Sequence, residues 1–395
     1  MPVAGLRESR SRAMTDDSAL EDFYRGQHVL LTGATGFMGK VIMEKLLRSC
    51  DLDTLYILIR PKKGVSPTER FGQLFGDPLF GRLRAERPDF LARVRAVAGD
   101  IAQPQLGISP DDWAELTDKL TLVIHGAATV RFDEKLHVAK AINVTGTESV
   151  VELVRACRRI RVLVHVSTAY AHCYLTHVEE RLYDTSEAYE NLKKVPKDEL
   201  AKESDRLVSE RSWPNTYAYT KALGEEVIRQ AVQEGLGNGV ATVVFRPAIV
   251  VSTAYEPLPG WIDNVYGPTG AVVGAGVGLI RTLQVDSTGC ANIVPVDMAC
   301  NALLASAREA ALHPGPGGVR VYNYVSSKEK PITWGEFMAN SARNGVAMPP
   351  TKSMWVYSLT LHKSRSMYLL YVLFLHFLPA LVADTICIIT KRRTR

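Results

Sequence analysis

The feature that most constrains the fold is a glycine-rich turn, T-G-A-T-G-F-M-G, at residues 32–39. It joins an apolar run of strand length, 28–32, to a stretch with helical spacing of its apolar residues, 37–50. Glycines in such a unit let the chain turn tightly and approach a pyrophosphate, while the helix N-terminus directs backbone N–H groups at the phosphates. The alternative is a turn that binds no ligand. The predicted cofactor-binding residues of this turn are Thr32, Gly33, Gly36, Phe37 and Gly39.

Further apolar runs of strand length alternate with segments of helical periodicity. They span residues 55–59, 94–98, 122–124, 162–166, 240–245 and 319–325. Continuous apolar strands separated by helices are typical of a parallel sheet that is covered on both faces. We therefore expect an α/β fold: a doubly wound, mostly parallel, Rossmann-like sheet with a smaller substrate-binding region and a C-terminal apolar helix.

The end of the second predicted strand, I-L-I-R-P-K-K, indicates which cofactor the turn binds. Folds that prefer NAD place an Asp or Glu about 20 residues after the turn, on the ribose 2′-hydroxyl. This chain has Arg60 there, followed by Lys62 and Lys63. A guanidinium matches a 2′-phosphate in charge and donor geometry. The sequence predicts NADPH over NADH, with a solvated basic loop as the alternative.

Two later strand ends complete the predicted cofactor site. The third strand ends at Gly99 and Asp100, and the Asp100 carboxylate is suited to accept a hydrogen bond from the adenine amino group. The fourth ends I-H-G-A-A-T-V, where small residues such as Ala127 allow a cofactor to lie against the backbone. Both positions fall on the carboxyl edge of the sheet, where ligands bind in such folds.

The heptapeptide N-T-Y-A-Y-T-K at residues 215–221 carries the candidate catalytic pair. Residues four apart share a helix face and residues two apart do not, so Tyr217 pairs with Lys221 and Tyr219 points away. A nearby ammonium is expected to lower the pKa of a tyrosine from its usual value of about 10. The phenol can then protonate an oxygen that gains charge as a hydride arrives at its carbon.

Other polar residues can support this pair. The fifth strand ends V-H-V-S-T-A-Y, which places Ser167 or Thr168 at the carboxyl end of the sheet. Asn143 is predicted to hold the lysine through a water relay, among the residues that bind the cofactor. A bare tyrosine–lysine pair on a surface helix is the alternative, and the glycine turn argues against it.

Three further residues offer other chemistries. His125 and His165 lie in or at the end of predicted strands, where satisfied core histidines are expected. Cys173 can be imagined as an acyl-accepting thiol, but no neighbouring residue in the sequence marks it as activated.

No His/Cys cluster has zinc spacing, so no metal is predicted. The net charge of +5 is spread along the chain and gives no support to nucleic-acid binding.

The two ends of the chain differ in character. Residues 1–20 lack the apolar run of a secretory signal and are predicted to be a disordered tail. Residues 367–390 are apolar, flanked by basic residues and long enough to span a bilayer, although His376, Pro379 and Asp384 interrupt them. A membrane-embedded segment and a buried helix of a further domain are the two interpretations.

The composition suggests where the domains divide. A catalytic domain is expected over 21–354, with a Gly/Pro-rich, irregular segment at 253–278 that covers the substrate. From residue 355 onward the chain becomes aromatic and apolar, and 355–395 is expected to be a C-terminal domain or apolar helix.

The motifs, taken in order, resemble a known family. The glycine turn, the strand-end serine and Y-x-x-x-K resemble the extended short-chain dehydrogenase/reductase superfamily. The match narrows to the alcohol-forming fatty acyl-CoA reductases, over about residues 22–385. The stretches that carry the narrower resemblance are V-L-L-T-G-A-T-G-F-M-G-K-V, I-L-I-R-P-K-K-G, H-G-A-A-T-V-R-F-D-E, P-N-T-Y-A-Y-T-K, F-R-P-A-I-V and E-P-L-P-G-W-I-D-N.

This resemblance implies an activity. Family members reduce a long-chain fatty acyl-CoA to a fatty alcohol with two NADPH. The first hydride gives a thiohemiacetal that expels CoA, and the second reduces the aldehyde. By motif, the glycine turn and Arg60 would hold the cofactor, and Ser167, Tyr217 and Lys221 would carry the chemistry. Other reductions on the same scaffold, of a hydroxysteroid or a sugar nucleotide, remain alternatives.

The resemblance also implies a location. The family has a further C-terminal domain that this chain enters and leaves early, at Arg395, so a truncated C-terminus is expected. A truncated NADPH-binding membrane protein without turnover is a third interpretation. The expected place is an intracellular membrane, endoplasmic reticulum or peroxisome, with the catalytic domain facing the cytosol. Oligomeric state and acyl chain preference are not predicted.

Overall fold

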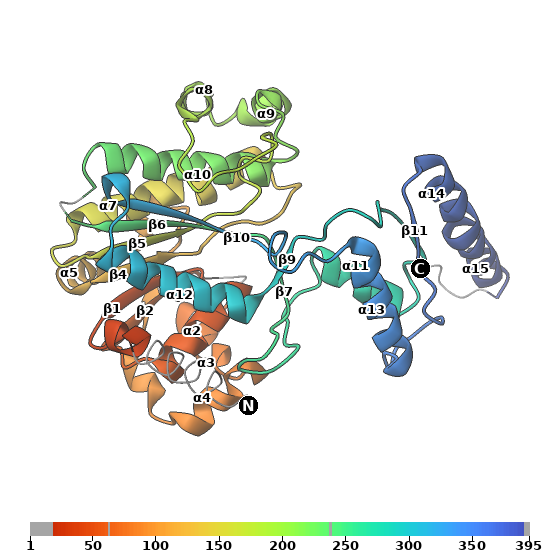
Figure 1. Ribbon diagram of the computed structural model, residues 1–395, viewed down its shortest axis with the longest axis horizontal. Helices are drawn as coiled ribbons and strands as arrows, with labels where there is room; N and C mark the ends of the chain where they lie inside the picture. The colour runs from red at the N-terminus through yellow and green to blue at the C-terminus, as the bar shows by residue number, and fades with distance from the viewer. Residues whose placement is uncertain (1–18, 62–63, 237–238, 391–395) are drawn as a thin grey trace, which may run out of the picture. The chain divides into compact units, whose positions relative to one another are not determined.

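The computed structural model describes residues 19–61, 64–236 and 239–390 (Figure 1). Residues 1–18 of the predicted tail lie outside the described residues, and so do Lys62 and Lys63. The chain divides into two compact units. Unit 1 comprises Met1–Ile262 and Val294–Tyr324, and unit 2 comprises Asp263–Ile293 and Val325–Arg395.

Unit 1 is built on a seven-stranded sheet in the order β10-β6-β5-β4-β1-β2-β3. Every neighbouring pair is parallel. The strands are β1 His28–Thr32, β2 Thr54–Ile59, β3 Val94–Ala98, β4 Leu122–His125, β5 Val162–Val166, β6 Ala241–Pro247 and β10 Val319–Tyr324. These strands match the predicted runs closely, and the doubly wound parallel sheet is confirmed.

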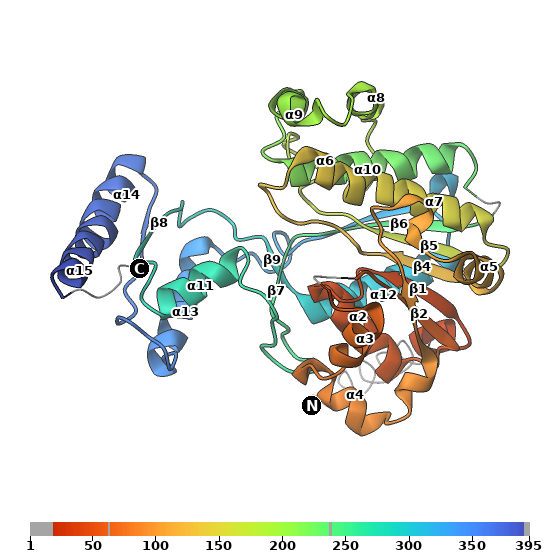
Figure 2. The ribbon, with the colours of Figure 1, turned by 180° about the vertical axis from the view of Figure 1, so that it is seen from behind.

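Helices cover both faces of the sheet because its strands are apolar on both sides. On β1, Val29 and Leu31 belong to one core cluster, and Leu30 belongs to the other. Helices α2 Phe37–Ser49 and α12 Val296–Leu312 lie against one face, and α7 Gly146–Ala156 and α10 Thr216–Gln233 lie against the other (Figures 1 and 2).

The remaining elements of unit 1 connect these layers. They are α3 Pro67–Leu74, η1 Pro78–Phe80, α4 Gly81–Glu86, η2 Phe90–Arg93, η3 Pro104–Gly107, α5 Pro110–Lys119, α6 Leu136–Ala139, the π-helix η4 Lys140–Thr145, α8 Ser186–Lys194, α9 Leu200–Ser209, η5 Pro316–Gly318 and the short pair β7 Ile249–Val251 and β9 Ile293–Pro295.

The strand order reverses at β1, which lies between β2 and β4. The chain builds outward from β1 to β3 and then returns to place β4 on the other side of β1. Ligands of such sheets bind in the crevice outside the carboxyl ends of the strands at this switch point. The glycine turn after β1 and the loop after β4 therefore meet where a dinucleotide is expected.

Among its described residues, unit 2 contains the helices α11 and α13, a longer helical stretch from α14 to α15 and a two-stranded parallel sheet. Its elements are α11 Pro268–Gly276, β8 Thr282–Gln284, α13 Trp334–Ala347, β11 Thr360–His362, α14 Arg365–Val372, the π-helix η6 Leu373–Phe377 and α15 Leu378–Ile389. The prediction of irregular structure throughout 253–278 is wrong at its end, where α11 forms. Pro268 occupies the first turn of α11, where its fixed φ favours a helix and its missing N–H is not needed.

The last helical stretch of unit 2 is long and apolar. Arg365–Ile389 spans 25 residues with a mean hydropathy of 2.2 in its most apolar window, and none of that window is buried. Pro379 lies in the first turn of α15, directly after η6, so the helix continues through it with a local change of hydrogen bonding. By length and composition alone, the stretch is able to cross a membrane, which is weak evidence that it does so.

Candidate active site

The glycine turn forms a close contact between backbones at the switch point. Gly33 has a φ of +77°, and a Cβ there would lie 2.7 Å from the amide nitrogen of Ala127. A Cβ on Gly39 would collide with the carbonyl oxygen of Gly33, so only glycine lets α2 begin so near the strand. Gly36 is the N-cap of α2 and Phe37 its first residue. This cradle fits a pyrophosphate at a helix N-terminus.

The floor of the cradle is held by hydrogen bonds around His125. Thr147 donates its hydroxyl to the Asn143 carbonyl, so the 3.1 Å contact between Thr147 Oγ1 and His125 Nε2 requires a proton on Nε2. His125 Nδ1 then accepts from the Thr32 hydroxyl at 2.8 Å. Thr32 Oγ1 in turn accepts from the amide of Ala127 at 3.2 Å. Burial lowers the pKa of His125 to about 3, so the ring is neutral.

His165 differs from its neighbour His125. It is fully buried, yet neither ring nitrogen has a hydrogen-bond partner among the described residues. The expectation of a satisfied core histidine therefore agrees with the structure for His125 and is wrong for His165. Burial lowers the pKa of His165 as well, so it adds no charge beside Lys221.

The two tyrosines of the heptapeptide lie on different faces of α10. Helix α10 begins at Thr216, and the N-cap Asn215 side chain accepts from the amide of Ala218 at 2.9 Å. Tyr219 is fully buried, and its hydroxyl donates to the carbonyl of Ala188 at 3.4 Å. Tyr217 lies instead beside the strand ends, with its ring centroid 5.9 Å from that of Phe132. The helical spacing therefore separated the two correctly.

Lys221 is buried and directed at the end of β5. Its Nζ donates to the carbonyl oxygen of Val166 at 2.6 Å. Burial lowers the pKa of Lys221 to about 8, and the charge of Glu225 opposes that shift. The ammonium is therefore close to its titration point at physiological pH.

The pKa of Tyr217 does not move in the expected direction. Burial raises it, and a hydrogen bond with the Thr168 hydroxyl partly offsets the rise. The expectation that Lys221 lowers this pKa is wrong for this structure, because the burial of the phenol has the largest effect and raises it. Tyr217 is a phenol at neutral pH, ready to donate a proton.

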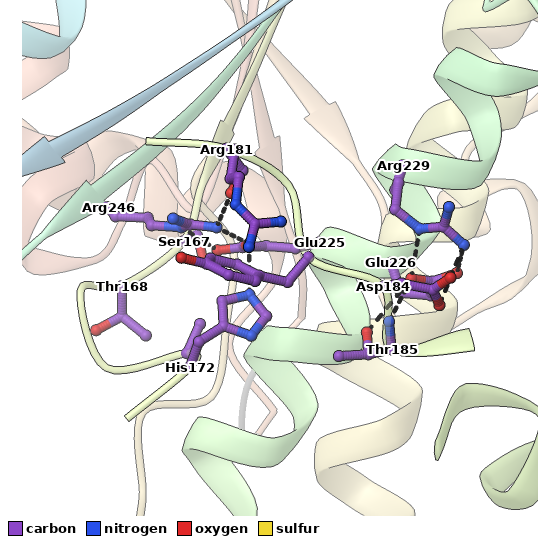
Figure 3. Close-up of polar contacts among 12 residues, drawn as sticks. Ser167, Thr168, His172, Arg181, Asp184, Thr185, Glu225, Glu226, Arg229 and Arg246 are labelled. Atoms are coloured by element: carbon purple, nitrogen blue, oxygen red, sulfur yellow. Dashed lines mark hydrogen bonds and ion pairs between the residues drawn. The ribbon is translucent and has the colours of Figure 1, made fainter. Parts of the chain in front are cut away.

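Ser167 and Thr168 are adjacent but have different surroundings. Ser167 donates its hydroxyl to Glu225 at 2.5 Å, and its amide donates to the carbonyl of Phe245 at 2.7 Å. Thr168 lies outside that cluster (Figure 3), and its hydroxyl is near enough to Tyr217 to lower the pKa of that phenol in part. The catalytic role of Ser167 stays a prediction, and the geometry favours Thr168 as the hydroxyl that works with Tyr217.

A buried charged cluster surrounds Glu225, the hydrogen-bond partner of Ser167. This cluster was not predicted from the sequence. Glu225 accepts from Arg246 Nη2 at 2.6 Å, from Arg246 Nε at 2.8 Å and from His172 Nε2 at 3.0 Å (Figure 3). Burial alone would raise the pKa of Glu225, but Arg246 and His172 hold it well below its usual range. An arginine within the apolar run F-R-P-A-I-V was the available signal, because a buried charge requires a partner.

Asn143 holds a loop. It lies in η4, a π-helical turn of the kind that often marks functional sites. Its Oδ1 accepts from the amide of Thr129 at 2.9 Å, and its Nδ2 donates to the Thr129 carbonyl at 3.2 Å and to Thr220 Oγ1 at 2.9 Å. The side chain thus fixes the loop after β4 to α10. The lysine relay through Asn143 stays a prediction.

The edge expected to contact the adenosine carries two guanidinium groups. Arg60 is exposed directly after β2, and Arg70 on α3 donates to the Arg60 carbonyl at 2.5 Å and to Thr35 Oγ1 of the glycine turn at 3.3 Å. Burial and the charge of Arg60 lower the pKa of Arg70. Asp100, after β3, accepts from the amide of Ala102 at 3.0 Å. Arg70 was not predicted from the sequence as a residue of this site.

The first part of the Gly/Pro-rich segment packs on the cofactor helix. The Trp261 ring is stacked with that of Phe37 at 5.5 Å, and its Nε1 donates to Asp77 at 3.0 Å. Glu256 accepts from Lys45 at 2.6 Å and Arg48 at 2.7 Å, both on α2. The segment therefore contacts α2 at its first residue, Phe37, and near its end, at Lys45 and Arg48. That it covers the substrate stays a prediction.

Comparison with known proteins identifies the family. A family described as Male sterility protein matches residues 31–303. The "Fatty acyl-CoA reductase wat" of Drosophila melanogaster is 40% identical over 382 residues, which cover 96% of this chain and 73% of that protein. The human "Fatty acyl-CoA reductase 1" is 36% identical, over 95% and 73%. The chain belongs to the fatty acyl-CoA reductase family. It is an oxidoreductase with a domain for a nicotinamide cofactor.

Solved structures agree on the fold of this fatty acyl-CoA reductase family member. The reductase domain of a nonribosomal peptide synthetase from Mycobacterium tuberculosis matches with a TM-score of 0.62 at 20% identity, over 89% of this chain and 78% of that one. The terminal R domain of the myxalamid pathway matches with a TM-score of 0.59 at 22% identity, over 85% and 72%. At such identities, the likeness establishes the reductase-type fold.

Proposed function

We propose that this chain reduces a long-chain fatty acyl-CoA to a primary fatty alcohol with NADPH, through an aldehyde, and releases CoA. The observation that carries the proposal is the place of Tyr217 on α10, one helical turn before Lys221, whose Nζ donates to the Val166 carbonyl at the carboxyl end of β5. The kinship with two proteins named fatty acyl-CoA reductases supplies the substrate class.

The residues of the chain would act on the carbonyl oxygen of the substrate. A nicotinamide cofactor, when bound, supplies the hydride. As the acyl carbon is reduced, its oxygen gains charge, and Tyr217 protonates it while Thr168 donates a second hydrogen bond. The Tyr217 phenolate then takes back the hydroxyl proton of the thiohemiacetal, which collapses to an aldehyde as CoA leaves as a thiolate and the phenol is restored. In the second reduction the same two hydroxyls serve the aldehyde oxygen.

Lys221 would support both rounds through its charge. Its ammonium is one turn below Tyr217 and is fixed by the Val166 carbonyl. Because the ammonium does not lower the pKa of Tyr217 in this structure, we assign its charge to binding the cofactor. Burial excludes water from the ammonium, which strengthens this electrostatic effect.

The choice of NADPH is supported by the basic edge. Arg60 stands where a carboxylate would bind the ribose 2′-hydroxyl of NADH, and Arg70 joins that position to the glycine turn. Two guanidinium groups repel each other, and a 2′-phosphate between them would relieve that repulsion. Asp100, Ala127 and Asn143 are proposed to complete the cofactor site along the same sheet edge.

We also propose a membrane location for unit 2. The support for this proposal is the length, hydropathy and exposure of the stretch Arg365–Ile389. The proposed compartment is the endoplasmic reticulum or the peroxisome, with the catalytic domain, over 21–354, facing the cytosol and 355–395 serving as the attachment. Cell fractionation with alkaline washing tests this, since a peripheral or soluble protein is released.

The activity is tested with the full chain purified in detergent. NADPH and palmitoyl-CoA should yield hexadecanol and free CoA, and Tyr217→Phe should lower turnover by about 10²- to 10⁴-fold because the proton donor is lost. Tyr219→Phe is the matched control and should retain activity. Folded wild-type protein that releases no CoA and forms no alcohol would overturn the proposed reaction.

A further inference from the structure

The loop after β4 carries exposed apolar side chains beside the proposed proton donor. Val130 is 54% exposed and Phe132 is 67% exposed. The rings of Phe132 and Tyr217 lie 5.9 Å apart between centroids, at an interplanar angle of 34°. An exposed phenylalanine leaves hydrophobic free energy unused, and an apolar ligand that covered the ring would gain it.

The backbone of this loop is firmly held, so it presents Phe132 at a defined place. Asn143 forms hydrogen bonds with both the amide and the carbonyl of Thr129, at 2.9 and 3.2 Å. The Thr129 hydroxyl is also 3.4 Å from the Glu134 carboxylate. The loop is thereby anchored to η4 and, through Thr220, to α10, the helix that carries Tyr217.

The charges next to Phe132 argue against an anionic ligand at this point. Arg131 pairs with Asp133, with Nη2 and Oδ2 3.2 Å apart. The pair leaves little net charge on the loop for the phosphates of CoA or of a dinucleotide. The exposed ring is therefore the recognition feature of the loop, and it fits a hydrocarbon.

We propose that Phe132 is a specificity residue that packs on the first methylene groups of the fatty acyl chain. The inference rests on the proposed function and adds to it the place where the chain leaves the reacting carbon. The oxygen bonded to that carbon must lie within hydrogen-bond reach of Tyr217 for proton transfer. The methylenes bonded to the same carbon then lie beside the ring that contacts Tyr217.

The test separates the acyl chain from the rest of the substrate by comparing palmitoyl-CoA with hexadecanal, which lacks CoA. For Phe132→Ala, KM should rise about tenfold for both substrates, since an apolar contact is lost, and KM for NADPH should be unchanged. Phe132→Leu should restore most of the loss. Leu91→Ala, at a comparably exposed residue on η2 before the amino end of β3, is the control.

Each other outcome rejects a defined idea. A rise in KM for palmitoyl-CoA alone would show that Phe132 contacts CoA, and a rise for NADPH would show that it contacts the nicotinamide; both overturn the proposal. Unchanged KM values in an active enzyme overturn it as well and leave the proposed function standing. A folded wild type that reduces neither substrate rejects the function and this inference together.

Discussion

Two neighbouring glutamates of α10, Glu225 and Glu226, belong to two ion clusters (Figure 3). The clusters differ in how far their arginine is exposed to solvent. Both carboxylates are buried. Glu225 faces the sheet and pairs with Arg246, which is 0% exposed. Glu226 pairs with Arg229, which is 16% exposed, and it accepts from the amide of Thr185 at 3.0 Å. Glu225 therefore holds Ser167 at the end of β5, whereas Glu226 holds the loop at Thr185.

The difference shows that the partner decides what a buried charge does. Arg246 has no access to water, so its charge depends on Glu225 and on backbone carbonyls at Glu179 and Arg181. Ser167 and His172 depend on the same carboxylate. Arg229 can be hydrated in part, so its cluster tolerates change better.

The largest expected effect breaks this comparison directly. Glu225→Gln keeps the volume but leaves the Arg246 charge uncompensated, and should lower the free energy of unfolding by about 3–5 kcal/mol. Glu226→Gln, its matched control, should cost less, about 1–3 kcal/mol, because Arg229 is partly exposed and keeps some hydration. Urea denaturation of both variants measures the difference. Equal losses would show that the exposure of the arginine does not matter.

The second effect concerns the two hydroxyls that the Glu225 cluster separates. Thr168→Val should lower kcat for palmitoyl-CoA by about 10²- to 10³-fold, as expected for the loss of one donor to a developing oxyanion. Ser167→Ala removes a hydrogen bond to Glu225 and should instead lower stability by about 1 kcal/mol, with little change in kcat. Steady-state kinetics and denaturation of both variants decide. If Ser167→Ala abolishes turnover while Thr168→Val retains it, the assignment is reversed.

The third effect is a pH dependence that links Glu225 to Lys221. The ammonium of Lys221, with its pKa lowered to about 8, is present below that pH and lost above it. Turnover should therefore fall about tenfold per pH unit above about pH 8. His125 and His165 stay neutral in this range and contribute no step.

The same profile tests whether Glu225 supplies the opposing charge. Because that carboxylate raises the pKa of Lys221, Glu225→Gln should move the fall to lower pH, and Glu226→Gln should leave it in place. The profile of kcat/KM for the residual folded enzyme provides the measurement. An unmoved profile in Glu225→Gln would detach Lys221 from the cluster.

The smallest effect concerns the exposed edge, far from either glutamate. Arg70→Gln should raise KM for NADPH about tenfold, the size of one charge-assisted hydrogen bond, and leave KM for NADH unchanged. Arg82→Gln, at a surface arginine paired with Glu86, is the control. A wild type that uses NADH as well as NADPH contradicts the cofactor choice itself. A parallel rise for both cofactors would limit Arg70 to supporting the turn.

The strands and the glycine turn could be predicted because they depend on local patterns. Gly33 and Gly39 are required by backbone contacts whose geometry the spacing T-G-x-x-G-x-x-G encodes. The choice of Tyr217 over Tyr219 followed from helical periodicity alone. The helix at Pro268–Gly276 was missed because its glycines and proline suggested irregular structure, although proline is favoured in a first turn.

The sequence by itself determined the strands of the sheet, the glycine turn and the placing of Tyr217 and Tyr219 on different faces of α10, because each depends on a pattern of residues within one strand, turn or helix. Only the tertiary structure showed that the Ser167 hydroxyl is bonded to Glu225 beside Arg246, since these two residues lie 58 or more positions away in the sequence. It also brought Phe132 beside Tyr217 and Arg70 beside Arg60. Such contacts join separate elements through packing and buried charge, which no local pattern records.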